Sequence, residues 1–139
     1  MSRFVVDASV AVKWFLSEPL AEHARRLLEP GHELIAPDLL LPEILERTAA
    51  AYPDNPAVVF QGRTILYREI QERTLRLAAG LRESGVSKGE RVAIMLPNCP
   101  QYIETLYAIL KTGGIAVNTN PMYVERELEH QLSDSGAET

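Results

Sequence analysis

The feature that most constrains the fold is a strand–helix–strand pattern in residues 91–118. Arg91–Leu96 is a nearly continuous apolar run, which is typical of a parallel-sheet strand covered on both faces. A helix is predicted over residues 100–111 from its apolar spacing, and Gly113-Gly114 ends it. Ile115–Asn118 is then a second short strand. This order predicts a crossover unit in which the two strands are parallel.

The first 44 residues repeat this pattern. Phe4–Val6 is a short β-branched run that predicts a strand, and Glu33–Ala36 predicts a second one. Between them, apolar spacing predicts a helix over residues 10–15 and another over 20–29, with Pro30-Gly31 ending the second. A right-handed crossover of this kind places the carboxyl ends of both strands at one edge.

Further elements are predicted between the two units and after them. A helix over residues 42–51 leads to a β-hairpin whose strands are residues 57–60 and 64–67. Helices over 68–84 and 125–135 each end at a glycine. The predicted fold class is therefore α/β, with two incomplete crossover units of short, mainly parallel strands and covering helices.

Composition narrows the class of protein. The chain has 139 residues, 46% of them apolar, which suits a soluble domain with a real core. Its net charge of −5 argues against a large nucleic-acid surface, and its single cysteine excludes an internal disulfide. No apolar run approaches the roughly 20 residues needed to span a bilayer, and no signal peptide is recognised, so a cytoplasmic location is expected.

Two carboxylates form a candidate metal site. Asp7 follows the first strand, and Glu43 lies just beyond the second, in the first turn of a helix. Both could face the same sheet edge, where their oxygens would suit Mg²⁺. The alternative interpretation is structural, because Asp7 could cap a helix and Glu43 could interact favourably with a helix dipole.

A resemblance supports the metal interpretation. The runs VVDASVAVKWFLSEP and ELIAPDLLLPEI resemble the opening of PIN-domain ribonucleases, particularly the toxins of bacterial toxin–antitoxin pairs. The resemblance implies catalytic roles for Asp7 and Glu43, Mg²⁺ bound with help from Ser9, and RNA or an antitoxin as partner. That family completes its site with further aspartates, and nothing of that kind follows Ile44.

A second resemblance covers most of the chain. The blocks LPEILERTAAAYPDNPAVVFQGRTILYREI, GVSKGERVAIMLPNCPQYIETLYAILKTGG and NTNPMYVERELEHQLSDSGAE resemble the N-terminal part of AMP-forming acyl-CoA synthetases. The NTNP and ELEHQL segments are most similar to long-chain fatty-acid–CoA ligases. The resemblance implies a parent enzyme that uses ATP and Mg²⁺ to make an acyl-adenylate and then transfers the acyl group to CoA.

No catalytic residue of the ligase family carries over. Its phosphate loop, its adenine- and ribose-binding segments and its C-terminal lysine match nothing in these 139 residues. Gly113-Gly114 is interpreted as a helix stop, because a phosphate site needs glycines between a strand and a following helix. Cys99 is interpreted as inert, and the three histidines as surface residues: His23, His32 and His130.

The two resemblances overlap at Leu41–Ile44, which predicts a partial nuclease opening over 1–44 and a ligase fragment over 41–139. Three hypotheses follow: a ligase fragment without complete catalysis, a Mg²⁺-dependent ribonuclease, and a non-catalytic chimera or recombination product. Both units lack partner strands, so self-association through exposed sheet edges and a transition of low cooperativity are expected.

Overall fold

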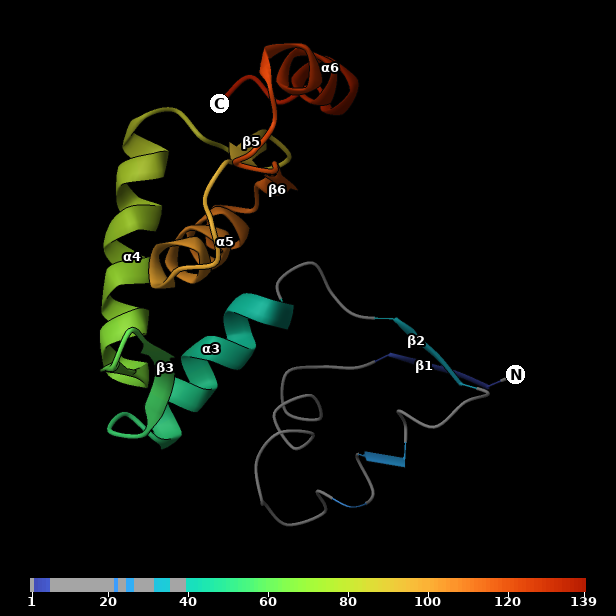
Figure 1. Cartoon of the computed structure of the whole chain (residues 1–139). Helices are drawn as coiled ribbons and strands as arrows, with labels where there is room; N and C mark the ends of the chain where they lie inside the picture. The colour runs from blue at the N-terminus through green and yellow to red at the C-terminus, as the bar shows by residue number, and fades with distance from the viewer. Residues whose placement is uncertain (1, 6–21, 23–24, 27–31, 36–39) are drawn as a thin grey trace.

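The computed structural model describes residues 2–5, 22, 25, 26, 32–35 and 40–139. Over these residues the chain is a mixed α/β structure, as predicted (Figure 1). Its elements in chain order are β1 (Ser2–Val5), β2 (His32–Ile35), α3 (Leu40–Ala51), β3 (Pro56–Phe60), β4 (Arg63–Leu66), α4 (Tyr67–Glu83), β5 (Arg91–Ile94), α5 (Pro100–Thr112), β6 (Ile115–Asn118) and α6 (Glu125–Ser135).

The described strands form three separate pairs, and two of these pairs are parallel. β1 pairs with β2, and β5 pairs with β6, each in parallel, whereas β3 and β4 are antiparallel. The prediction of short strands is therefore confirmed, and two of the three described pairs are parallel, as the prediction of mainly parallel strands expects. β1 and β2 begin slightly earlier than predicted. The helices predicted over 10–15 and 20–29 lie outside the described residues, apart from residues 22, 25 and 26.

α3 and the β3–β4 hairpin follow from local backbone chemistry. α3 begins at Leu40, earlier than the predicted start at Pro42, because a proline in the first helical turn forfeits no intrahelical hydrogen bond. The hairpin turns at Gln61 and Gly62, which have φ angles of 48° and 77°. Two successive left-handed residues match the twist of an antiparallel pair, so the predicted hairpin is confirmed.

α4 is the longest described helix, and α5 packs across it (Figure 1). The first turn of α4 is stabilised by the Glu69 carboxylate, whose Oε2 accepts a hydrogen bond of 2.8 Å from the Leu66 amide. Ile70 lies on the buried face of α4. An ion pair also joins the two helices, with 3.2 Å between Arg73 Nη1 and Glu104 Oε1.

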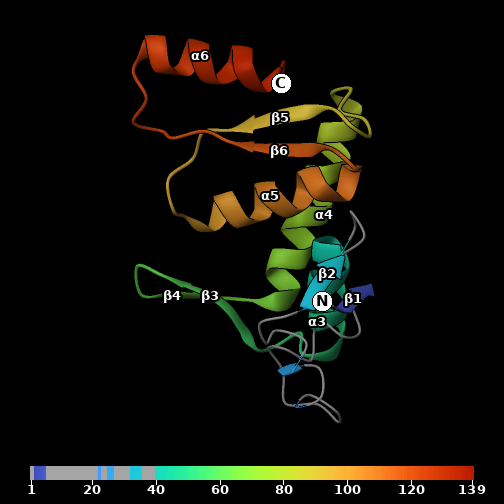
Figure 2. The same ribbon diagram turned by 90° about the vertical axis from the view of Figure 1, so that its right-hand side faces the viewer.

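One cluster of the core lies where α5 packs on the β5–β6 pair, and further buried residues lie on α3 and α4. The buried side chains of this cluster come from β5, from α5 and from the turn after α4, with half-buried leucines around them: Val86, Val92, Ile94 and Ile109, with Leu81, Leu96 and Leu106. Figure 2 shows α5 along one side of the two strands and α6 along the other. The strand–helix–strand crossover predicted for residues 91–118 is thus present.

The prediction that Arg91–Leu96 is covered on both faces is wrong. β5 ends at Ile94, and its burial alternates, with Val92 and Ile94 buried while Arg91 is exposed. Met95, just beyond the strand, is 40% exposed. The physical reason is that α6, on the side opposite α5, has no buried residue. Only the α5 side of this pair is tightly packed.

Candidate functional site

The structure describes one of the three residues predicted to bind Mg²⁺. Asp7 and Ser9 lie outside the described residues. Glu43 is in the first turn of α3, as predicted, and its side chain is exposed. Within the described part of the chain, no group of three or more His, Cys, Asp or Glu residues is placed to hold a metal ion. The predicted metal site therefore remains a prediction.

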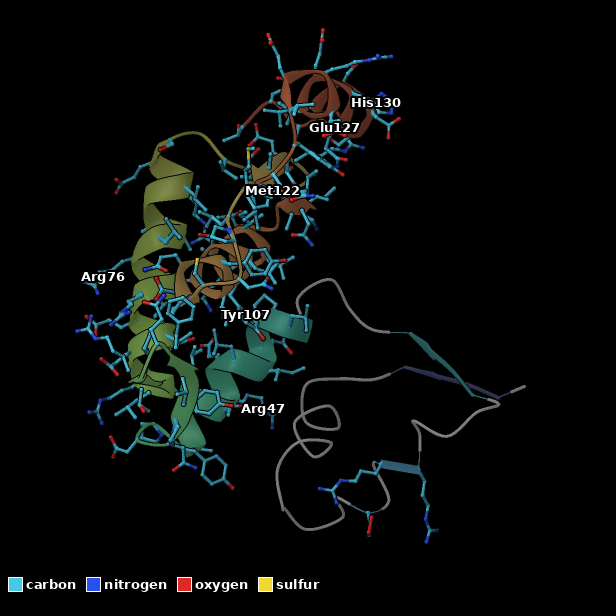
Figure 3. All side chains as sticks on the ribbon, viewed as in Figure 1. Arg47, Arg76, Tyr107, Met122, Glu127 and His130 are labelled. Atoms are coloured by element: carbon cyan, nitrogen blue, oxygen red, sulfur yellow. The ribbon has the colours of Figure 1, made fainter. Side chains whose placement is uncertain are left out.

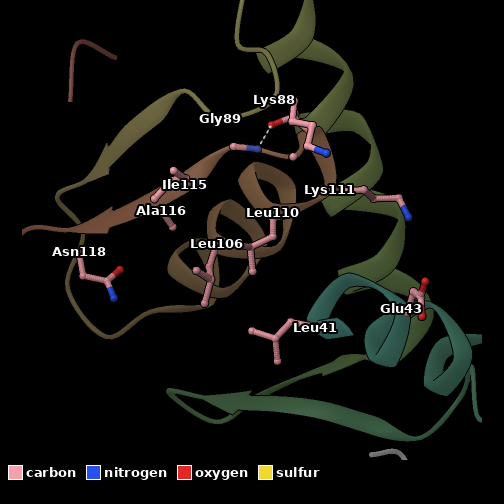
Figure 4. A pocket seen from close by; sticks show the side chains of 13 residues that line it. Leu41, Glu43, Lys88, Gly89, Leu106, Leu110, Lys111, Ile115, Ala116 and Asn118 are labelled. Carbon is pink, nitrogen blue, oxygen red and sulfur yellow. Dashed lines mark hydrogen bonds between the residues drawn. The ribbon is translucent and has the colours of Figure 1, made fainter. Parts of the chain in front are cut away.

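Glu43 borders a groove between the start of α3, α5 and β6, which Figure 4 shows from close by. The groove has a volume of about 890 Å³, within the range of small-molecule sites. Apolar side chains form much of its wall, and charged groups lie at its margin: Leu41, Leu106, Leu110, Ile115 and Ala116, with Glu43, Lys88 and Lys111. Sequence reasoning did not identify this groove.

Lys111, at the margin of the groove, connects α5 with α3 and α4. Its Nζ lies 2.7 Å from Glu46 Oε2 on α3, and its main-chain carbonyl accepts a 2.7 Å hydrogen bond from Arg82 Nη2 on α4. Lys111 and Glu46 are 65 positions apart, so no local sequence signal could have paired them. This pairing balances the charge of Lys111, which makes its ammonium group a poor candidate for binding an anion.

Gly113 and Gly114 do not form a phosphate site. Gly113 has a φ of 81° and caps α5, and its N–H donates to carbonyls of the helix. The N–H of Gly114 donates to the Ile109 carbonyl at 3.1 Å. Because both amide groups are already bonded within the chain, neither is available to cradle a phosphate. The prediction of a helix stop is confirmed.

The other candidate side chains are separated from one another. Cys99 is a half-buried free thiol just before α5, beside a cavity of about 200 Å³ whose described lining includes Val58 and Phe60 but no histidine. His130 is exposed on α6, as expected (Figure 3). His23 and the His32 side chain lie outside what the structure describes. The described residues thus bring no nucleophile and base together at Cys99.

Among the described residues, Tyr107 is the titratable group whose pKa is most clearly affected by its surroundings. It extends from α5 on the side of α3 (Figure 3). Burial raises the pKa of its phenol above the ordinary value of 10.0, and the neighbouring Tyr67 adds to this effect. Burial disfavours the charged phenolate, so the folded protein holds this proton to a higher pH than the unfolded chain does.

We therefore expect the free energy of unfolding to be unaffected by Tyr107 below about pH 10 and to fall as the pH rises further. Tyr107→Phe should reduce this alkaline loss, because the variant has no proton to release at that position. Urea denaturation followed by circular dichroism between pH 8 and 11 measures the effect. Tyr123→Phe, the same change in the turn before α6, should leave the alkaline fall in place.

Comparison with known proteins decides the family. The AMP-binding enzyme family matches residues 45–139, which is most of the chain and includes α4, β5, α5, β6 and α6. The chain belongs to the AMP-binding enzyme family. Residues 1–44 lie outside this match.

Curated relatives within this family are much longer than the chain. It is 48% identical over 104 residues to a long-chain-fatty-acid–CoA ligase of Bacillus subtilis, which covers 75% of this chain and 19% of the ligase. A long-chain-fatty-acid–CoA ligase of Salmonella typhimurium is 49% identical over 98 residues, covering 70% and 18%. The chain thus spans about a fifth of the length of these relatives.

A solved structure has a similar fold. The N-terminal subdomain of NpsA from Klebsiella oxytoca matches 70% of this chain with a TM-score of 0.67 and 34% sequence identity, over 26% of its own length. At this identity the likeness supports the family as well as the fold. Among the described residues, no helix has the length and apolar character required to cross a membrane.

Proposed function

We propose that the chain is an N-terminal portion of an AMP-forming acyl-CoA synthetase whose parent activates long-chain fatty acids. The observation that carries this proposal is the 48% identity to a long-chain-fatty-acid–CoA ligase, which extends over 104 residues. The parent reaction would use ATP, with Mg²⁺, to form an acyl-adenylate and would then transfer the acyl group to CoA. The ligase portion corresponds to residues 41–139.

The role proposed for this portion is structural. Its described residues form the β5–β6 pair, which α5 covers, and α3 and α4 pack against α5. The amides of Gly113 and Gly114 are bonded within the chain, and the described residues assemble no group of three metal ligands. We therefore infer that acyl-adenylate formation requires residues outside these 139.

We expect no ATP–pyrophosphate exchange above the no-protein blank when the chain is incubated with palmitate, ATP and Mg²⁺. Exchange needs a bound adenylate, and the chain supplies only part of the enzyme that would bind it. The full-length Bacillus subtilis ligase serves as the positive control. Fatty-acid-dependent exchange by the purified chain would contradict the structural role.

The fatty-acid assignment is tested separately by a segment exchange. Residues 45–139 would replace the matching segment of the Bacillus subtilis ligase, to which they are closely related. If the chain derives from a long-chain ligase, the hybrid should retain palmitate-dependent exchange. A folded hybrid that activates a short aromatic acid but not palmitate would contradict the proposed substrate.

A Mg²⁺-dependent ribonuclease is the second candidate. The observation that favours it is the parallel β1–β2 pair, after which Asp7 and Glu43 follow in sequence. In this proposal residues 1–44 are a partial PIN-type opening, with Asp7 and Glu43 as catalytic ligands and Ser9 as a further ligand. A non-catalytic chimera is the third possibility, and it is expected to be inactive in both assays.

Ribonuclease activity, if residues 1–44 supply it, should depend on Mg²⁺ and on both carboxylates. We expect Asp7→Asn and Glu43→Gln each to abolish cleavage of a structured RNA, because each removes a charged metal ligand. Gel analysis of labelled RNA, with Glu46→Gln as a matched control on the same helix, measures this. Cleavage that survives both substitutions would exclude this site.

A further inference from the structure

The edge of β5 that faces away from β6 makes a main-chain hydrogen bond to the segment after α6. The Ile94 carbonyl points toward β6, where it accepts a 2.9 Å hydrogen bond from the Thr119 amide. Neighbouring residues of a strand direct their main-chain groups to opposite sides, so those of Ala93 face the other edge. There the Ala93 amide donates a 2.7 Å hydrogen bond to the main-chain oxygen of Thr139. The chain thus begins to pair with β5 after α6.

The sides on which α5 and α6 lie identify the same edge independently. Crossovers between parallel strands of one sheet are right-handed, so two crossovers that run across a sheet in opposite directions place their helices on opposite faces. α5 connects β5 to β6 along one face, and α6 lies along the other (Figures 1 and 2). A strand after α6 therefore belongs on the far side of β5. If it belonged beyond β6, α6 would share the face of α5.

The connection from β6 to Thr139 also fits a parallel strand. Residues 119–138 lie between them and include α6, and parallel strands are joined by a connection of this kind. α6 is capped by Gly136, and a Cβ atom there would lie 3.8 Å from Nη1 of Arg91, at the start of β5. Thr139 lies beside Ala93, further along the same strand. The segment after α6 therefore advances in the direction of β5.

We propose that the outer edge of β5 is the docking site for a parallel strand formed by the residues that follow Thr139 in a longer protein of this family. The inference rests on the proposed function, because the ligase parent supplies that strand. The sheet would then have three parallel strands, with β5 in the centre, α5 on one face and α6 on the other. Leu128 and Leu132, one turn apart on α6 and half-buried here, would help to cover the added strand.

The hydrogen bond to Thr139 also determines the register of the added strand. Within the β5–β6 pair, Ile94 lies opposite Asn118, and its carbonyl accepts from Thr119, the residue after its partner. The amide of a residue in a parallel pair correspondingly donates to the residue before its partner. Because the Ala93 amide donates to Thr139, the partner of Ala93 is the first residue after Thr139. The Ala93 carbonyl would then accept a hydrogen bond from the second.

Crosslinking distinguishes the two edges of the sheet. In a Cys99→Ser background, the chain would be extended by roughly eight residues, enough for a strand, taken from the position after that aligned with Thr139 in the Bacillus subtilis ligase. The first added residue would be replaced by cysteine. Ala93→Cys should then form an intramolecular disulfide under mild oxidation, because neighbouring strands are about 4.8 Å apart, a Cα separation that a disulfide accommodates. Val117→Cys, at the β6 position paired with Ala93, should form far less.

Hydrogen exchange of the Ala93 amide tests the main-chain pairing without a crosslink. The extension should hold Thr139 in place and slow exchange of this amide roughly tenfold relative to the unextended chain. A control extension with proline at its second position lacks the N–H that would bond to the Ala93 carbonyl, so it should protect the amide less. Circular dichroism would establish that the extended chains and the cysteine variants retain the fold.

A disulfide formed by Val117→Cys in place of Ala93→Cys would overturn the proposal, as would a folded, extended chain that forms neither. Equal protection of the Ala93 amide by the two extensions would also contradict it, because the added residues would then not pair with β5. These outcomes are separate from palmitate activation. A hybrid ligase that rejects palmitate would contradict the proposed substrate, and the Ala93→Cys disulfide would still identify the docking edge.

Discussion

Ile109→Ala is expected to lower the free energy of unfolding by about 2–5 kcal/mol. Ile109 is fully buried on α5, at 0% exposure, and it packs with Val92 and Ile94 of β5 and with Val86. Truncation removes apolar contacts and leaves a cavity, because the strand on one side and α4 on the other limit how far the site can collapse. A loss of this size is a large fraction of the stability of a small domain.

Ile115→Ala is the matched control, because it makes the same chemical change at a half-exposed position on β6. Ile115→Ala should lower the free energy of unfolding much less, since the side chain of Ile115 buries less apolar surface than that of Ile109. Urea denaturation followed by circular dichroism measures both variants, and agreement of the m values would indicate that the denatured states are comparable. Equal losses of unfolding free energy at the two positions would mean that Ile109 is not part of the core on the α5 side of the sheet.

Local signals explain why most of the ligase-like part was predictable. The limits of β6 and α6 agree with the predicted ranges. Glycines precede β6 and follow α6, and the regular spacing of apolar residues indicates the helix between the turn and the second glycine. The left-handed conformation at the end of α5 was likewise predictable, because Gly113 is a glycine and glycine adopts that conformation readily. These features depend on residues that are close together in the sequence.

Features that depend on distant residues were not predictable. The Arg73–Glu104 and Lys111–Glu46 ion pairs each join different helices, and the groove exists only because α3, α5 and β6 come together. β5 was predicted to be buried on both faces from its apolar run alone, but burial depends on whether a second layer packs closely. Proximity of Asp7 to Glu43 likewise remains a prediction, since Asp7 lies outside the described residues.

Gly113→Ala is expected to destabilise the fold by about 1–3 kcal/mol, because the substitution places a side chain where the backbone favours glycine. The residue has a φ of 81°, in the left-handed region, at the end of α5. A Cβ atom there would also lie 3.1 Å from Lys88 Cγ and 3.2 Å from Lys88 Cβ, which is tighter than ordinary contact. The main-chain hydrogen bond from Gly89 to the Gly113 carbonyl, at 2.9 Å, limits how far the two segments can separate.

Gly80→Ala provides a control with the opposite expected sign. Gly80 lies inside α4, and a Cβ atom there would meet nothing within 4 Å. Alanine has the higher helix propensity and restricts the unfolded chain, so this variant should be more stable by about 0.5–1 kcal/mol. Chemical denaturation of both variants therefore separates backbone conformation from the general effect of adding a methyl group. If Gly113→Ala were also stabilising, the αL cap could not be what ends α5, and the turn that joins α5 to β6 along the groove would need a different explanation.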